Sequence, residues 1–305
     1  MAKTDLTKSL LSRFDRLKGQ RQNWETHWQE VADYMQPRKA DVTKQRSRGD
    51  KRTELIFDSS PIQAVELLAA SLHGMLTNPA TPWFSLRFKD SQLDMEDEAK
   101  LWLESATEVM YTAFSRSNFQ QEIFELYHDL ITFGTAAMHV QEDNEDVLKF
   151  STRHINEIFI AEDDKGRIDT VYRKFKLSAR AAMQQFGEAV STDIKSQIKK
   201  DPYNEVDILH AVYPRADFNP KLKDTENMPF ESVYVEYKNA NELSVSGFQE
   251  FPFVVPRYLK ASHEVYGRSP AMTALPDVKM LNEMSKTTIK AAQKQVDPPL
   301  LVPDD

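Results

Sequence analysis

The first 35 residues carry apolar side chains at spacings of three, four and seven, and this period constrains the fold more than any other feature. Residues three and four apart lie on one face of an α-helix, so the pattern is typical of an amphipathic helix. It predicts one long helix that begins near Leu6 and stops before Pro37. The members of the stripe are Leu6, Leu10, Phe14, Leu17, Trp24, Trp28, Val31 and Met35.

The helical period continues as far as residue 134, with two interruptions. Residues 38–52 are polar and basic and indicate a loop, and the alternation of Trp83–Phe88 predicts a short strand. A second helix begins after Asp58–Pro61, where capping side chains precede a proline, and ends near Asn78. Two further helices are predicted over 94–114 and 118–133, and the second of them closes at Gly134.

From residue 136 the apolar period changes from helical spacing to two, which is typical of strands. Strands are predicted over 138–140, 147–150, 158–160, 168–175, 206–213, 232–237, 242–245 and 253–255, with short helices at 178–186 and 191–200. A long helix follows over 271–296, with Met272, Leu275, Val278, Leu281 and Met284 on one side and a delayed start or a bend expected at Pro276. The whole pattern predicts the α+β class.

The change of period divides the chain into three parts. Residues 1–134 form a helical region, residues 135–260 a β-rich region with mixed or antiparallel strands, and residues 261–305 a terminal helix and its continuation. A length of 305 residues suits one large or two medium domains. The absence of cysteine excludes a disulfide scaffold, a thiolate zinc site and a cysteine nucleophile.

The net charge of −8 argues against bulk nucleic-acid binding, which usually leaves a basic footprint. The longest apolar run, 64–76, is too short to span a bilayer and is interrupted by Glu66 and His73. The N-terminal segment lacks the apolar core of a secretory signal. We therefore expect a soluble protein that is made inside the cell.

The sequence contains no motif for catalysis. Phosphate-binding loops, dinucleotide-binding glycines, nucleophile elbows and zinc-binding His-Glu-x-x-His motifs are all missing. The seven histidines are scattered, and the acidic runs 142–146 and 162–164 lack the spacing of a calcium loop and are better interpreted as solvated turns. We predict a protein that is not an enzyme, with no catalytic residues, no metal site and no cofactor.

Two basic features invite a functional interpretation. The loop contains Arg38, Lys39, Lys44, Arg46, Arg48, Lys51 and Arg52. It is either a solvated arm or a contact for phosphates or for an acidic partner surface. The terminal helix carries one lysine stripe, Lys279, Lys286, Lys290 and Lys294. The stripe is either the solvated face of an amphipathic helix or, in a ring of copies, a set of cationic rings that face a polyanion.

Several short sequence segments, called phrases below, resemble in their order the portal, or head-to-tail connecting, proteins of short-tailed bacteriophages. They are Phe14–Leu17, Arg21–Trp24, Trp28–Val31, Phe57–Pro61, Ala69–Pro79, Trp83–Leu86, Phe133–Met138 and Tyr266–Ala271, the last ahead of a long helix. The resemblance extends from about Leu6 to Val296 and corresponds to the N-terminal portion of such a protein. None of the phrases is diagnostic alone, and their order carries the resemblance.

The resemblance implies a structural protein of the virion, made in the cytoplasm of a bacterial host and placed at the portal vertex of the capsid. Portal proteins form a ring, usually of twelve copies, through which DNA is packaged and ejected without sequence recognition. By this resemblance residues 6–260 would be mostly peripheral wing, and the helix after residue 270 would be the first stem helix, which faces the DNA. The chain ends at Asp305, where a clip would begin. The implied partners are other copies of the chain, capsid and scaffold proteins, the terminase and a tail adaptor.

Two other classes stay open on the sequence alone. A DNA-processing enzyme or a nucleic-acid-binding regulator with a helical N-terminal domain could assemble its site from distant carboxylates. A cellular scaffold with no role in DNA handling is the third alternative. Cleavage of plasmid DNA in the presence of magnesium distinguishes the first from a portal.

Overall fold

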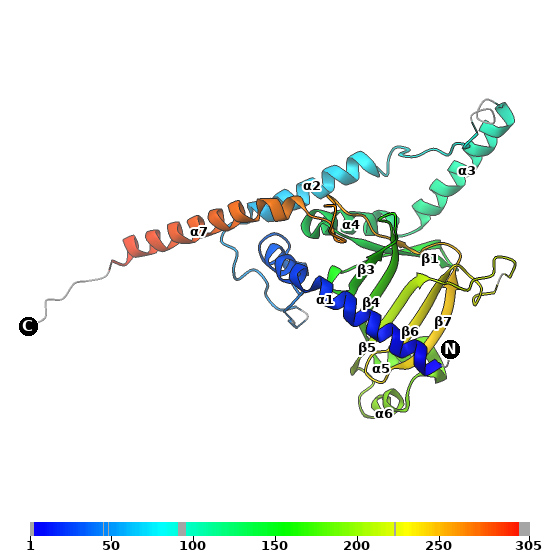
Figure 1. Cartoon of the computed structure of the whole chain (residues 1–305). Helices are drawn as coiled ribbons and strands as arrows, with labels where there is room; N and C mark the ends of the chain where they lie inside the picture. The colour runs from blue at the N-terminus through cyan, green and yellow to red at the C-terminus, as the bar shows by residue number, and fades with distance from the viewer. Residues whose placement is uncertain (1–2, 45, 48, 91–95, 223, 299–305) are drawn as a thin grey trace, which may run out of the picture.

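The computed structural model describes residues 3–44, 46–47, 49–90, 96–222 and 224–298. It combines helices with two antiparallel sheets, which confirms the α+β class (Figure 1). The helices are α1 (Lys3–Met35), α2 (Ser60–Leu76), α3 (Asp97–Arg116), α4 (Phe119–Phe133), α5 (Ala179–Phe186), α6 (Thr192–Lys200) and α7 (Pro270–Val296), with 3₁₀ turns at Pro37–Lys39, Ile155–Glu157 and Gly187–Ala189. No helix among these residues combines the length and the apolar character needed to cross a membrane.

The strands form a five-stranded sheet and a three-stranded sheet. They are β1 (Ala137–Asp143), β2 (Val147–Arg153), β3 (Ile158–Glu162), β4 (Ile168–Ser178), β5 (Glu205–Pro214), β6 (Phe230–Glu236), β7 (Asn241–Phe248) and β8 (Phe253–Val254). The larger sheet has the order β3-β4-β5-β6-β7, in which each strand pairs with its successor in the chain. The smaller sheet has the order β2-β1-β8 and is also antiparallel. All strands except β8, which pairs with the distant β1, therefore have a sequence neighbour as a partner.

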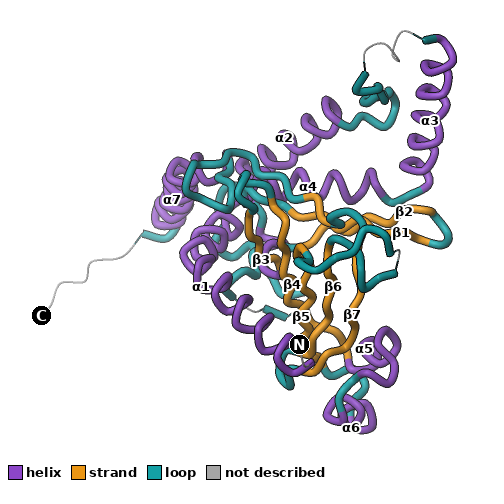
Figure 2. The backbone as a smooth tube through the Cα atoms, turned by 45° about the vertical axis from the view of Figure 1, so that its right-hand side comes forward, coloured by secondary structure: helices purple, strands orange, loops and turns teal. Residues whose placement is uncertain are grey.

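The N-terminal half of α1 covers one face of the five-stranded sheet (Figures 1 and 2). Leu10 and Phe14 are buried against strand residues that share this face, including Phe159 and Leu209. Phe14 and Phe159 meet edge to face, with their ring centroids 4.7 Å apart. The opposite face of the same sheet packs at one end against α5 and α6, through a separate apolar cluster that contains Ile194. The sheet is therefore covered on both sides.

The largest core lies where the helices meet both sheets. Its buried residues come from α1, α2, α4, the two sheets and the beginning of α7. Trp28 lies at its centre, and its indole N–H donates to the carbonyl oxygen of Phe133 at 3.0 Å. The predicted helical region, 1–134, and the predicted β-rich region, 135–260, contribute to this one core.

The predicted strand over Trp83–Phe88 is wrong, because the segment pairs with no strand among the described residues. The hydroxyl of Tyr111 on α3 replaces a partner strand. It accepts from the backbone N–H groups of Trp83 and Phe84, both at 2.7 Å, and donates to the carbonyl oxygen of Phe84 at 2.9 Å. Alternation predicts that one side of a segment is buried, and a helix can bury that side as well as a sheet can.

The terminal helix α7 begins at Pro270, without the predicted delay, and continues through Pro276. It extends away from the body, as α3 does on the other side (Figures 1 and 2). The predicted apolar side of α7 is only partly correct: Met272 and Leu275 are buried, whereas Leu281 and Met284 are exposed. Steps of three residues turn by about 300°, so the series drifts around the helix and leaves the body after three members.

Candidate functional site

The position of α7 is fixed at its first residue. Ser269 caps the helix, because its Oγ accepts from the backbone N–H of Met272 at 2.9 Å and donates to the carbonyl oxygen of Thr132 at 2.8 Å. Pro270 occupies the first helical position, where its missing N–H leaves no bond unmade. The cap therefore joins the beginning of α7 to the last turn of α4.

Two glycines allow the segments before α7 and after α4 to cross in backbone contact. Gly134 has φ +75°, and a Cβ there would overlap the carbonyl oxygen of Gly267 and lie 2.6 Å from the backbone carbon of Arg268. A Cβ on Gly267 would overlap the carbonyl oxygen of Gly134 in return. The N–H of Gly267 also donates to Thr135 Oγ1 at 2.8 Å. The phrases Phe133–Met138 and Tyr266–Ala271 thus meet in space and direct α7 outward.

Farther along α7, Asn282 holds the loop that leads into α2. Its Oδ1 accepts from the N–H of Phe57 at 2.7 Å, and its Nδ2 donates to the carbonyl oxygen of Leu55 at 2.9 Å. Asn282 is the last buried residue of the helix. From Thr287 to Pro298 every residue is exposed, so the outer end of α7 extends beyond the body.

The four predicted lysines lie on one side of α7, but their surroundings differ. Lys279 pairs with Glu30 of α1, and this hydrogen-bonded carboxylate raises the pKa of Lys279. Lys286 pairs with Glu283 on the same helix at 3.0 Å. Lys290 and Lys294 lie on the outer end and have no carboxylate partner among the described residues. The geometry therefore separates two neutralised lysines from two uncompensated ones.

A second face of α7 is apolar and exposed. Met280 and Met284 are 60% and 59% exposed, and Leu281 is 39% exposed. On a helical projection they lie about 130° from the lysines, with Ala291 in line beyond them. An apolar stripe that the described residues leave uncovered is typical of a surface that contacts another molecule.

The basic loop is folded onto α1 over its first half. Gln29 Oε1 accepts from the N–H groups of Val42 at 3.0 Å and Thr43 at 2.9 Å, while Gln29 Nε2 donates to Asp33 Oδ1 at 2.9 Å. Asp33 in turn pairs with Lys44 at 2.8 Å. One glutamine therefore fixes the path of the loop.

Most basic side chains of the loop are already neutralised. Lys39 lies 2.7 Å from the buried Asp129 and 2.6 Å from Glu125; burial alone would lower the pKa of Lys39, but these carboxylates outweigh it and raise the pKa. The other ion pairs are Lys44 and Arg46 with Asp33, and Arg52 with Asp41. Arg38 and Lys51 are exposed and have no ion pair among the described residues, and Arg48 lies outside those residues.

The sequence interpretation missed one group of polar side chains, which the fold brings together from both sheets. His139 and Arg153 of the three-stranded sheet face Arg173 and His210 of the five-stranded sheet across a cavity. They are far apart in sequence, and no motif links them. Among the described residues, no group of three or more His, Asp or Glu side chains is arranged to hold a metal ion.

Residues 7–305 match the protein family described as the bacteriophage head to tail connecting protein. The chain belongs to this family, and the resemblance found in the sequence is confirmed.

Two similar phage proteins carry portal names, one of them as a probable portal protein. The chain is 35% identical over 309 residues to the probable portal protein of Bordetella phage BPP-1, an alignment that covers 99% of this chain and 56% of the relative. It is 33% identical over 309 residues to the portal protein of Salmonella phage epsilon15, with 99% and 55% covered. The chain thus spans a little over half the length of these relatives.

Proposed function

We propose that the chain supplies the body and the first channel-facing helix of a portal subunit, a structural and non-enzymatic component of the virion. The observation that carries this proposal is the outer end of α7. It leaves the body, carries Lys290 and Lys294 on one face, and continues an apolar stripe on another. The described residues leave the apolar stripe of this helix uncovered, whereas neighbouring copies would cover it.

The proposed assembly is a ring of twelve copies. In such a ring the stripe formed by Met280, Leu281 and Met284 packs against the next copy, and Ala291 lets the helices approach closely. Helix α2 adds a second exposed apolar face, on which Leu67 is 71% exposed. Only Pro61, Val65 and Ala69 of this largely apolar helix are buried in the single chain.

The proposed role of the lysines is to face double-stranded DNA in the channel, through which DNA is packaged and ejected. Ammonium groups act as point charges on phosphates and read no sequence, which suits DNA that must slide. Lys290 and Lys294 would carry this role, because Glu30 and Glu283 already neutralise Lys279 and Lys286.

The proposed location is the portal vertex of the capsid, after synthesis in the cytoplasm of a bacterial host. The proposed partners are capsid and scaffold proteins, the terminase and a tail adaptor. Arg38 and Lys51 are the basic loop residues left for an acidic partner surface, because their guanidinium and ammonium groups are exposed and unpaired among the described residues.

Ring formation is tested by electron microscopy of the complete gene product in negative stain. We expect rings of about twelve copies, and expect Met284→Lys to abolish them, because a charge would be buried between neighbouring helices. Tyr203→Lys is the matched control, since Tyr203 is 69% exposed on a loop next to α6. Monomers alone from the unmodified protein, or equal ring yields for the two variants, would refute the proposal.

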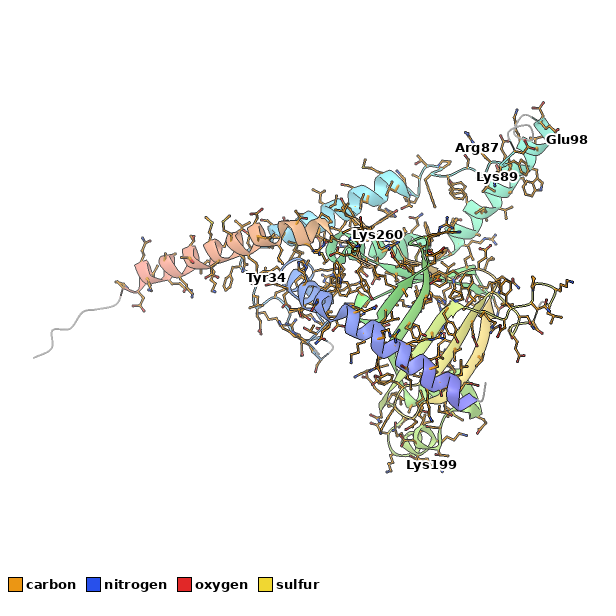
Figure 3. All side chains as sticks on the ribbon, in the orientation of Figure 1. Tyr34, Arg87, Lys89, Glu98, Lys199 and Lys260 are labelled. Atoms are coloured by element: carbon orange, nitrogen blue, oxygen red, sulfur yellow. The ribbon has the colours of Figure 1, made fainter. Side chains whose placement is uncertain are left out.

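The role of the lysines is tested in the phage by the amount of DNA packaged per head. We expect Lys290→Gln with Lys294→Gln to lower packaging or retention while the ring yield is unchanged. The control is Lys199→Gln with Lys200→Gln on α6, at a different end of the molecule from α7 (Figure 3). Loss of the rings themselves would instead assign the two lysines a role in packing.

A further inference from the structure

One row of polar side chains crosses the five-stranded sheet between two apolar clusters. Arg173, His210 and Tyr234 are direct neighbours on β4, β5 and β6. On one side of this row lie Val171 and Val212, which belong to the largest core. On its other side the sheet leads into the apolar cluster that packs against α5 and α6. His210 is only 3% exposed, and its ring stacks on Tyr234 with the centroids 3.9 Å apart. Polar side chains between two apolar clusters do not serve to keep the protein soluble, so another role is expected for them.

The three-stranded sheet adds two more donors opposite this row. His139 on β1 and Arg153 on β2 lie on the same face of their sheet, because Arg153 is two residues from Ser151, the direct partner of His139. The rings of His139 and His210 are 6.2 Å apart. Both arginines and both histidines line a cavity of about 300 Å³ between the sheets.

Two of these groups have buried nitrogen atoms without a partner. His139 is 7% exposed, and its Nε2 has no hydrogen-bond partner among the described residues; the same holds for Arg153 Nε. The carboxylate of Glu157 is already engaged, because it accepts from Arg173 Nε at 2.8 Å. Arg153 Nε is always a donor, and His139 Nε2 is a donor whenever it carries the ring proton; since buried donors are nearly always satisfied in folded proteins, an additional acceptor is expected at this place.

We infer that this cavity binds a phosphate group, either as the free ion or at the end of a small phosphomonoester. Two guanidinium groups face it against the single carboxylate of Glu157, which leaves an excess of positive charge beside the unpartnered Nε2 of His139. Guanidinium groups offer paired N–H donors that match the oxygens of a phosphate. The site is separate from α7 and does not depend on the proposed role of that helix.

The positive charges around the cavity also act on the two histidines. Burial, together with the charges of Arg153 and Arg173, lowers the pKa of His139 to about 4. Burial and the neighbouring His139 also hold the pKa of His210 well below its usual value. A bound anion would reverse the repulsion from the arginines and raise both pKa values.

The inference is tested by titrating the folded chain with inorganic phosphate in a calorimeter, against sodium chloride of equal ionic strength. We expect saturable binding to one site, and expect Arg153→Gln to weaken it about tenfold or more, the effect of losing a charged hydrogen bond. Lys149→Gln is the matched control, because Lys149 is an exposed cation on the same strand and does not line the cavity. Glycerol 3-phosphate, titrated in parallel, distinguishes the phosphomonoester from the free ion by the tighter of the two affinities.

A second measurement covers the case in which Arg153→Gln does not fold. The C2–H resonance of His139 in the unmodified chain is followed by NMR against pH, with and without phosphate. We expect the midpoint to rise by at least one pH unit when phosphate is present. No saturable binding by the unmodified chain, equal weakening in the Lys149→Gln variant, or an unchanged midpoint would each overturn the inference.

Discussion

Replacing Gly134 by alanine should destabilise the protein more than any change in backbone conformation alone can explain. The substitution has two effects: it places a side chain at φ +75°, and it introduces a Cβ 2.6 Å from the backbone carbon of Arg268. The left-handed conformation costs a non-glycine residue roughly 1–2 kcal/mol. Carbon atoms in contact lie about 3.5–4.0 Å apart, so the crossing segments must separate by about 1 Å.

No side-chain rotation can relieve the overlap, because the atoms that the new Cβ meets belong to the backbone of Gly267 and Arg268. Forcing extra volume into packed structure costs about 1–3 kcal/mol. Together with the conformational term, the expected loss in the free energy of unfolding is about 2–5 kcal/mol for Gly134→Ala. The same movement strains the hydrogen bond from Gly267 to Thr135.

Gly166 provides the matched control. Its φ is +74°, almost that of Gly134, but a Cβ there would meet only the ammonium end of the flexible Lys260 side chain. Gly166→Ala should therefore lose only the conformational term, about 1–2 kcal/mol. Urea unfolding of both variants measures the difference. If the two losses agree within about 0.5 kcal/mol, the close crossing is not what requires glycine at position 134, and the reasoning fails.

Two further predictions concern buried ionisable groups. Lys39→Met should lower the free energy of unfolding in urea by about 3–5 kcal/mol, because it leaves the buried Asp129 carboxylate without its ammonium partner. A decrease below about 1 kcal/mol would contradict the importance of this pair. The protein should also lose stability as the pH falls from about 6.5 to about 4. Over this range the two histidines bind protons in the unfolded chain, whereas the lowered pKa values of His139 and His210 keep them neutral in the folded protein. For His139 alone the free energy of unfolding falls by about 3 kcal/mol by pH 4. His139→Gln should flatten the dependence of the free energy of unfolding on pH, measured between pH 7 and pH 4. An unchanged pH dependence would exclude His139 as its source.

The secondary structure was predictable from the sequence wherever a local rule decides it. Ser269 and Pro270 mark the beginning of α7 as a cap and a first-turn proline should, and Gly134 ends α4 in the left-handed conformation. The period of two located the strands from their own side chains; all of them except β8, which pairs with the distant β1, also pair with a sequence neighbour. Trp83–Phe88 failed because its partner is a tyrosine hydroxyl on a helix, which alternation does not reveal.

The candidate site was predictable only in part. The spacing of the lysines on α7 follows from helix geometry alone, but their neutralisation depends on Glu30, which is 249 residues away from Lys279 in the chain. The drift of Leu281 and Met284 away from the body was in principle predictable, since it follows from steps of three on a helix of 3.6 residues per turn. The cavity between the sheets was not, because it requires the register of β1 and β2 together with that of β4 and β5.

The charge of the chain takes a different meaning once its distribution is known. A net charge of −8 opposes DNA binding only if the charge is spread evenly, and it is not: between residues 279 and 296 there are four lysines and one glutamate. Ion pairs with Glu30 and Glu283 confine the uncompensated charge to Lys290 and Lys294, at the end of α7 farthest from the body. Screening limits each ammonium group to about 8–10 Å, so the acidic body does not cancel them. A ring built on this helix would therefore hold DNA weakly at the outer end of α7, which suits a conduit better than a uniformly basic protein would.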